Sequence, residues 1–439
     1  MERIYEKYPL TLEGFGEFLR KELVGRPESS PGANPEDTGH HLPVMGGERG
    51  LVDMNTAIAY SLALGDDNPL YTEPLYGRST RWGQMVVTPV ITNLIRYLPP
   101  HPRGYGDWPV THLVGGIGWE WNEPIRVGDK FKTTFYLSDM VEKKGRTGRL
   151  FITYSDSKYW NQYKELVATG RGSQIMIGRD VTVEDIQAGR GFRDSMLYER
   201  KTYKYSKEEI QKIEDGINAE KRRGAEPLYW EDVSVGDKLT PLVKGPLTMG
   251  DLMGFAAMLT AGGHTCFELT YRNVKKGSRA PLENPATGWP YEHMWMEHYD
   301  MNLCLDRGLP GPFDEGQMRC CTPVHLLSNW MGDDGFIRRL ETQLRKPNFY
   351  GDTQWVYGEV VKKYIDKVGD EEYGAVDIKI DQINQIGENS APGKATVYLP
   401  SPNKPVTIPV PHENKFEEYE KYLDDCKKKT EQLKALGYL

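Results

Sequence analysis

The stretch Gly65-Asp66-Asp67-Asn68-Pro69-Leu70-Tyr71 decides how the rest of the chain is interpreted. It follows an apolar run, residues 57–64, that predicts a short helix. Pro69 cannot continue that helix, because it lacks a backbone N–H and restricts the residue before it. Asp66 is therefore expected at a helix break, where a carboxylate can act as an acid or base in a cleft. The alternative is a plain turn, since Gly, Asp, Asn and Pro are common turn residues.

Residues 65–71 resemble the signature of MaoC-like, (R)-specific enoyl-CoA hydratases, Gly-Asp-x-Asn-Pro-Leu-His, except at the last position. Tyr71 stands where that family has His. The resemblance implies a hot-dog fold, in which a curved antiparallel sheet wraps a central helix. It also implies acyl thioesters of coenzyme A or acyl carrier protein as substrates. We expect no bound redox cofactor and no metal, with coenzyme A present only as part of the substrate.

The composition is that of a soluble globular protein of 439 residues, enough for two domains and extensions. No stretch approaches the length of a membrane span, and the N-terminus has no apolar signal core, so we expect a cytoplasmic protein without a membrane partner. A formal net charge of −8 argues against nucleic acid as a partner. The five cysteines show no C-x-x-C spacing, which favours reduced thiols, with Cys320 and Cys321 packed as small apolar residues.

A second part of the chain repeats the order of the first. Residues 316–324 echo residues 83–90, and the Gly351-Asp352 pair before a strand echoes Gly128-Asp129. In each part a helical pattern precedes segments of period two, which predicts an α+β fold of helix followed by antiparallel strands. With the resemblance, this becomes a double hot-dog, two tandem repeats that each wrap a central helix.

The predicted organisation has five parts. They are an N-terminal helix and loop over residues 1–50, a first repeat over 51–180, a charged helical linker over 181–228, a second repeat over 229–402, and a charged C-terminal helix over 403–439. Residues 230–245 are expected to hold a strand that includes Val235-Gly236-Asp237. Thr248 is expected to cap the helix that follows.

Hydration of an enoyl thioester needs a base for water, an acid for the α-carbon, and donors for the enolate-like oxygen. By resemblance, Asp66 is the family's carboxylate and Asn68 lies in the same motif. In the second repeat, His298 and Asp300 belong to a His-Tyr-Asp sequence that resembles a family variant. His293 lies five positions before His298, where an acidic or amide residue is expected. The backbone N–H that holds the thioester carbonyl corresponds to Thr88 in the first repeat and Thr322 in the second.

Neither repeat contains the complete Asp/His pair, so three interpretations stay open. One interpretation places the active site in the second repeat, with His298 as base and His293 or Glu297 as helper. Another places it in the first repeat, with Asp66 alone as base and the Tyr71 hydroxyl orienting the water. In the third, the chain binds CoA esters but has lost or changed the hydratase chemistry.

Other function classes have less support. His264 and His325 add to the histidines of the second repeat, but their spacing matches no metal-ligand pattern. The sequence contains no G-x-S-x-G element of a serine hydrolase. The leading hypothesis is an acyl-CoA hydratase or dehydratase, a hydro-lyase that forms a homodimer or higher homo-oligomer. The alternatives are a hot-dog thioesterase and a non-catalytic acyl-CoA-binding or scaffold subunit.

Overall fold

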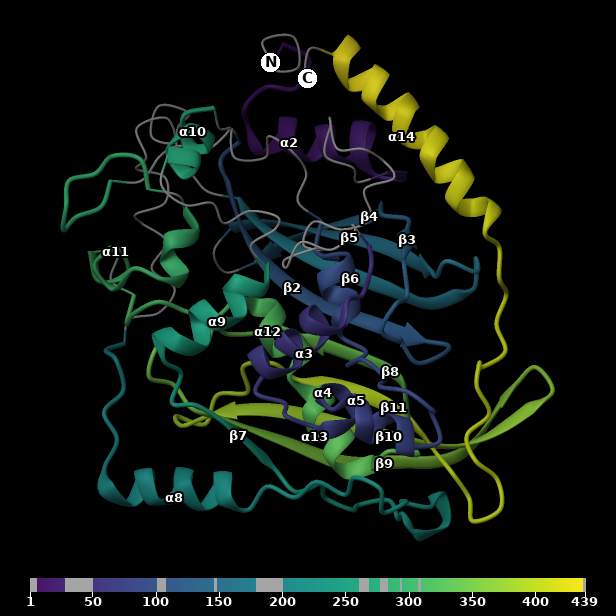
Figure 1. The fold of residues 1–439 in the computed structure, drawn as a ribbon. Helices are drawn as coiled ribbons and strands as arrows, with labels where there is room; N and C mark the ends of the chain where they lie inside the picture. The colour runs from purple at the N-terminus through teal and green to yellow at the C-terminus, as the bar shows by residue number, and fades with distance from the viewer. Residues whose placement is uncertain are drawn as a thin grey trace.

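The structure, a computed structural model, describes residues 6–27, 50–100, 108–145, 148–178, 200–259, 268–276, 283–292, 294–306 and 309–436. Eleven strands form one antiparallel sheet in the order β1-β4-β5-β6-β2-β8-β11-β10-β9-β7, with β3 paired to β5 (Figure 1). The strands are β1 (Arg26–Pro27), β2 (Val110–Trp121), β3 (Lys132–Thr133), β4 (Tyr136–Gly145), β5 (Gly148–Trp160), β6 (Leu166–Gly178), β7 (Leu242–Lys244), β8 (Phe336–Gln343), β9 (Gln354–Val368), β10 (Glu371–Asn384) and β11 (Gly393–Leu399).

The sheet consists of two halves with the same strand order. In the first half, β2 pairs with β6, β6 with β5 and β5 with β4; in the second half, β8 pairs with β11, β11 with β10 and β10 with β9. The halves join where β2 pairs with β8, with Trp119 opposite Leu340. The shared order confirms the internal repeat, and the whole is the predicted α+β double hot-dog fold. The four boundaries between the predicted parts remain predictions.

Two long helices lie on one face of the sheet and contact each other, α3 (Met54–Ala63) and α9 (Met249–Leu259) (Figure 1). Both helices begin at polar caps. The Asp53 carboxylate accepts the Thr56 N–H at 3.0 Å, and the Thr248 hydroxyl accepts the Asp251 N–H at 3.2 Å, as predicted for Thr248. Tyr60 of α3 packs beside Phe255 of α9, with ring centroids 6.1 Å apart. The two repeats therefore share one hydrophobic core.

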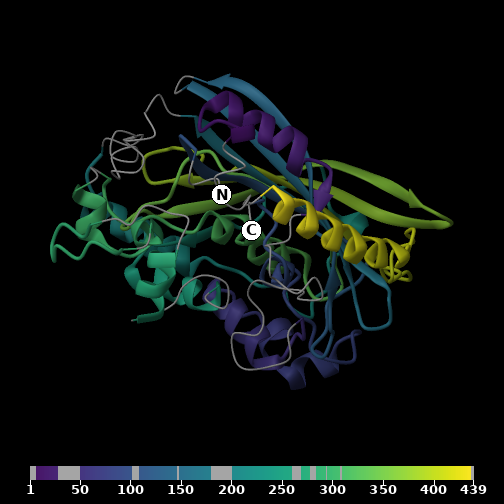
Figure 2. The same ribbon diagram turned by 90° about the horizontal axis from the view of Figure 1, so that it is seen from above.

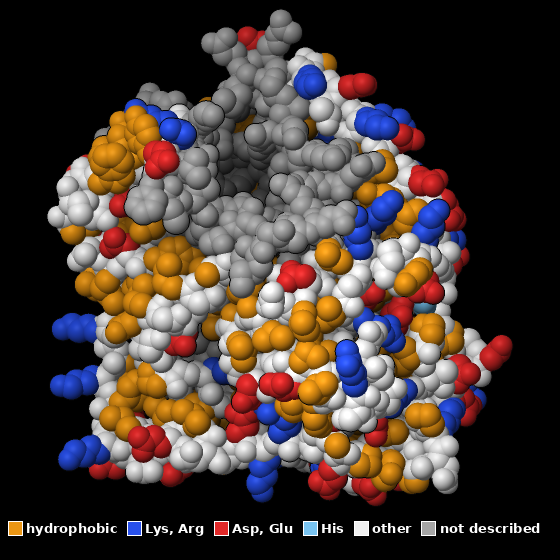
Figure 3. Space-filling model, in the orientation of Figure 1, with side chains coloured by type: hydrophobic (Ala, Val, Ile, Leu, Met, Phe, Trp, Pro, Cys, Tyr) orange, Lys and Arg blue, Asp and Glu red, His pale blue; other side chains and the backbone are white. Residues whose placement is uncertain are grey.

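Short helices complete this layer. They are α4 (Pro69–Thr72), α5 (Pro74–Ser79), α6 (Ile91–Ile95), α10 (Glu268–Lys276), α11 (Met301–Asp306), α12 (Gly316–Cys321) and α13 (Pro323–Met331), with 3₁₀ turns over Trp230–Asp232 and Met294–His298. Hydrophobic side chains gather beside α10 on the face in Figure 3, where Tyr271, Trp289 and Tyr291 contact one another. No described helix combines the length and the apolar character that crossing a membrane requires.

The N- and C-terminal helices pack against the first half of the sheet (Figure 2). The N-terminal segment forms α2 (Leu12–Phe18) and a π-helical turn over Leu19–Leu23, and its side chains Phe15, Phe18, Leu19 and Leu23 are buried. The C-terminal segment forms α14 (Glu417–Ala435), whose Leu433 joins the same cluster. This confirms the predicted amphipathic helices at both ends.

The connection between the repeats contains one exposed helix, α8 (Lys207–Asn218), as predicted. The prediction of a strand that includes Val235-Gly236-Asp237 is wrong, because these residues form a turn. In residues 230–245, the strand is Leu242–Lys244. Gly236 has φ +96°, and the Asp237 carboxylate accepts the Ser234 N–H at 2.8 Å. A positive φ suits glycine and ends strand geometry.

Cys320 and Cys321 are buried free thiols, as predicted, and burial raises the pKa of Cys321 to about 12. The Cys321 sulfur lies 3.5 Å from the Tyr60 hydroxyl, so these thiols pack in the shared core.

Candidate functional site

Asp66 lies at the predicted helix break and is 2% exposed. α3 ends at Ala63, and Gly65 reverses the chain with φ +67°. The Asp66 Oδ1 atom accepts the Asn68 N–H at 3.1 Å, and the Asn68 side chain accepts the Leu70 N–H at 3.0 Å to begin α4. Asn68 is therefore a cap that holds the turn. The turn is confirmed, and the role of the buried carboxylate as an acid or base remains a prediction.

His325, from α13 of the second repeat, is the imidazole nearest to this carboxylate among the described residues. Its Nε2 atom lies 3.8 Å from Asp66 Oδ1 and 2.8 Å from Glu220 Oε1. Its Nδ1 atom lies 2.8 Å from Lys244 Nζ. The imidazole is 3% exposed, so its two nitrogens depend on these neighbours. A carboxylate of one repeat and a histidine of the other thus meet across the repeat interface.

Lys244 sets the tautomer of His325. Its Nζ atom donates to Leu64 O at 2.9 Å and Gly65 O at 3.1 Å, and its third contact is His325 Nδ1. An ammonium group has three protons and no acceptor, so Nδ1 accepts and Nε2 carries the imidazole proton. Burial lowers the pKa of Lys244, and the charges of Asp66 and Glu220 oppose that change.

Glu220 closes the solvent side of this cluster. Its Oε1 atom accepts from both His325 Nε2 and Asn329 Nδ2, each at 2.8 Å. These bonds, the one from His325 first, lower the pKa of Glu220 to about 2. The nearby Arg222 pairs with Asp67, whose side chain is 76% exposed, as predicted for a turn residue. The segment after α8 therefore ties the Asp66 turn to α13.

Tyr71 connects the cluster to an apolar pocket. It is buried, and Ser328 of α13 is a polar neighbour of its hydroxyl. Burial and then the Asp66 charge raise the pKa of Tyr71 far above its ordinary value. The hydroxyl therefore stays protonated in the physiological range and cannot be a general base.

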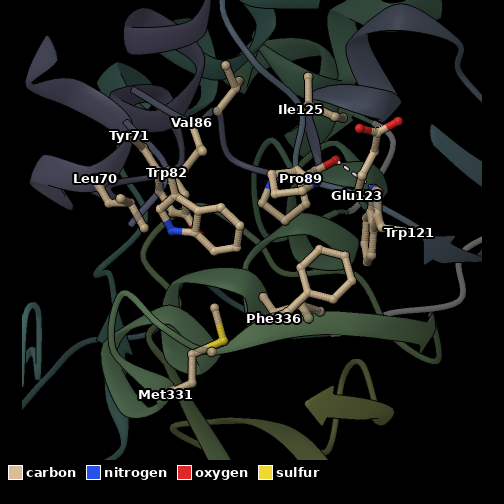
Figure 4. Close-up of a pocket in the computed structure, with 14 residues that line it drawn as sticks. Leu70, Tyr71, Trp82, Val86, Pro89, Trp121, Glu123, Ile125, Met331 and Phe336 are labelled. Atoms are coloured by element: carbon tan, nitrogen blue, oxygen red, sulfur yellow. Dashed lines mark hydrogen bonds between the residues drawn. The ribbon is translucent and has the colours of Figure 1, made fainter. Parts of the chain in front are cut away.

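The pocket beside Tyr71 is narrow, with a volume of about 40 Å³ (Figure 4). Its walls come from both repeats: Leu70, Tyr71, Trp82, Val86, Val87, Pro89, Trp121, Glu123, Pro124, Ile125, Met331, Gly335, Phe336 and Ile337. Glu123 is the one carboxylic acid among them, and burial raises its pKa. The walls are otherwise apolar or aromatic, which suits a hydrocarbon group more than a charged one.

The two predicted carbonyl-binding threonines differ in one respect. The Thr322 N–H donates to Met318 O at 3.0 Å inside α12. Among the described residues, the Thr88 N–H has no hydrogen-bond partner, and Thr88 is buried between the pocket residues Val87 and Pro89. In the first repeat, the Thr88 N–H is therefore available as a donor beside an apolar pocket. In the second repeat, the corresponding Thr322 N–H is already bound to a backbone carbonyl.

The predicted residues of the second repeat lie in a different set of contacts. His298 Nδ1 donates to Phe313 O at 2.7 Å, and its Nε2 lies 4.0 Å from Glu315. Asp300 accepts the Leu303 N–H at 2.9 Å and so caps α11. Among the described residues, no hydrogen bond or ion pair joins His298 to Asp66. His293 lies outside the described residues. The catalytic role of His298 remains a prediction.

Sequence reasoning did not select Lys244 or Glu220, and it considered His325 only as a possible metal ligand. In the described part of the chain, no cluster of three or more His, Cys, Asp or Glu side chains could hold a metal ion. His325 follows Thr322-Pro323, the echo of Thr88-Pro89, which is the one sequence signal that places it near the site.

Comparisons with known proteins agree with this fold. Residues 38–170 match the model of the FAS1-like dehydratase domain region. A solved structure described as a MaoC-like dehydratase is similar at 15% identity and TM-score 0.52, over 80% of this chain and 95% of that one. A putative MaoC domain dehydratase from Chloroflexus aurantiacus is 13% identical, with TM-score 0.46, over 80% of this chain and 92% of that one. No curated protein sequence matches significantly. The family match and the first structure confirm the resemblance to MaoC-like hot-dog dehydratases.

Proposed function

We propose that this chain, a double hot-dog protein whose first repeat matches a dehydratase region, adds water to 2-enoyl thioesters or removes it from 3-hydroxyacyl thioesters. One observation carries the proposal. Buried Asp66 lies near Tyr71, which lines an apolar pocket, and the unpartnered N–H of Thr88 belongs to the residue between Val87 and Pro89, which line the same pocket.

The chemistry follows from these groups. In dehydration, Asp66 takes the proton from the α-carbon, and the Thr88 N–H donates to the thioester oxygen as negative charge develops there. The C3–O bond then breaks, and the leaving oxygen takes a proton. Hydration reverses these steps. Asp66 suits the base because its carboxylate is buried beside the pocket but keeps a hydrogen bond from Asn68.

The pocket residues suit the acyl group, and the thioester carbonyl would lie at Thr88. Coenzyme A is the expected carrier of the acyl group. The proposed reaction needs no metal or redox cofactor. The aromatic walls Trp82, Trp121 and Phe336 favour a flat or compact acyl group, since about 40 Å³ has room for only a few water molecules.

Mass spectrometry with a panel of enoyl-CoA esters in ordinary and oxygen-18 water tests the proposal. Gain of one labelled water, lost in Asp66→Asn and kept in His298→Gln, supports a hydratase working in the first repeat. Loss in His298→Gln alone would instead assign the work to the second repeat.

The same experiment separates the alternatives. Release of free CoA thiol would identify a thioesterase. Binding of the esters without any product would identify a non-catalytic subunit. Tyr71, which replaces the His of the family motif, is the observation that favours this alternative.

A further inference from the structure

We infer that His325 and Lys244 form a proton relay that serves the leaving oxygen, so that the second repeat supplies the imidazole missing from the first. This inference rests on the proposed function. It assigns His325 as the catalytic acid for dehydration and Lys244 as the residue that positions and reprotonates it.

The geometry puts the right proton in the right place. Lys244 donates to Nδ1, so the proton on Nε2 points toward the two carboxylates, Asp66 at 3.8 Å and Glu220 at 2.8 Å. Two polar atoms 3.8 Å apart can both reach one oxygen at ordinary hydrogen-bond distances of about 2.8 Å. A water or hydroxyl oxygen that contacts Asp66 can therefore also reach His325 Nε2, where it takes the place of Glu220 as the acceptor of the Nε2 proton.

The relay solves a chemical problem for a neutral imidazole. Such a ring is a poor acid if losing its proton leaves an imidazolate. Here Nδ1 takes a proton from the Lys244 ammonium as Nε2 gives one to the leaving hydroxide, so the ring stays neutral. Burial lowers the pKa of Lys244, which makes that transfer easier.

Charges and protons balance over the cycle. Asp66 gains the α-proton, the C3–O bond breaks, hydroxide gains the Nε2 proton and leaves as water, and Lys244 becomes neutral. Asp66 then releases its proton to solvent, Nε2 takes one proton from solvent, and the Nδ1 proton returns to Lys244, which restores the starting tautomer. Glu220 has a side chain 33% exposed and belongs to the connection between repeats, so it lies on the side from which protons and water can exchange.

A substrate with a leaving group that needs no acid gives the sharpest test. We would compare 3-hydroxyacyl-CoA with 3-fluoroacyl-CoA, because fluoride leaves without being protonated. Both substrates still need Asp66 for the α-proton. Wild type, Asp66→Asn, His325→Gln and Lys244→Met would be assayed. His412→Gln is the matched histidine control, because the hydrogen bond of its ring within the described residues is with the Val410 carbonyl.

We expect His325→Gln to lower kcat for water loss by about 10²–10⁴-fold, as for a lost general acid, and to change fluoride loss by less than about tenfold. KM should change little. Lys244→Met should show the same selective loss, and Asp66→Asn should lose both reactions. Fluoride release by His325→Gln also proves that this buried-site variant is folded.

Two results would overturn the relay and leave the proposed function intact: equal loss of both reactions in His325→Gln, which indicates a structural histidine, or loss of neither. A wild-type protein that releases neither water nor fluoride from any acyl chain in the panel would overturn the proposed function and the relay together.

Discussion

Asp66 Oδ1 lies 3.8 Å from Nε2 of His325, and this contact joins the helix break of one repeat to α13 of the other. In the resembling family, one motif supplies both the carboxylate and the imidazole. Here the position for that imidazole is Tyr71, and a histidine from the opposite repeat approaches the same carboxylate. In the proposed mechanism, the two halves of the duplicated chain each supply one member of the catalytic pair.

Asp66→Asn should remove the base with little effect on the fold. The amide oxygen can still accept the Asn68 N–H that now binds Oδ1, so the turn is retained. We expect kcat/KM for dehydration to fall by about 10²–10⁴-fold. Asp67→Asn is the matched control, because that side chain is 76% exposed and should affect rate only slightly. Steady-state kinetics with thermal unfolding of both variants checks this, and equal losses in the two would contradict it.

Tyr71→Phe separates the second sequence interpretation from the relay. Removing the hydroxyl removes a buried polar group beside Ser328, and we expect a loss of about 1 kcal/mol in the free energy of unfolding. Activity should fall by less than about tenfold, below the effect of a general acid or base. Urea unfolding and kcat/KM measure the two effects. A hundredfold loss of rate in a folded variant would make the Tyr71 hydroxyl the group that orients water.

The sequence predicts the parts of this molecule that depend on local chemistry. Pro69 and Gly65 set the turn, and period-two alternation gives the strands of both halves. The residues around the carboxylate were harder to identify, because Lys244, His325 and Glu220 come from a strand, a helix and a connection that only the folded chain brings together. The strand expected at Val235–Asp237 failed for a related reason, since a glycine with positive φ makes a turn that alternation does not reveal.

Glu220→Gln should change how stability depends on pH. The folded-state pKa of Glu220 is lowered from 4.5 to about 2, so its ionised form contributes stability that is present above about pH 4.5 and lost as pH falls toward 2. Because the side chain is one-third exposed, we expect a loss of about 1 kcal/mol in the free energy of unfolding at pH 7. The difference from wild type should shrink below pH 4.5 and close near pH 2.

Denaturant unfolding from pH 7 to pH 3 measures this difference. Glu226→Gln is the control in the same connection, because that side chain is 77% exposed in its pair with Arg223 and should change stability by less than about 0.5 kcal/mol. If the loss of stability in Glu220→Gln does not decrease toward low pH, the ionised form of Glu220 is not what stabilises the fold, and the prediction is wrong.

Trp82→Leu should change the acyl preference of the enzyme. The indole lines the narrow pocket and donates to Asp333 O at 2.9 Å, so it fixes one wall (Figure 4). A smaller side chain adds room for about one or two methylene groups, each worth about 1–3 kcal/mol of discrimination in an apolar pocket. We expect kcat/KM to rise for longer acyl chains relative to shorter ones by about tenfold or more.

Competition assays with acyl-CoA esters of graded length measure this ratio. Trp289→Leu, at an exposed tryptophan that does not line the pocket, should leave the ratio unchanged. An unchanged ratio in Trp82→Leu would place the acyl group elsewhere than in this pocket.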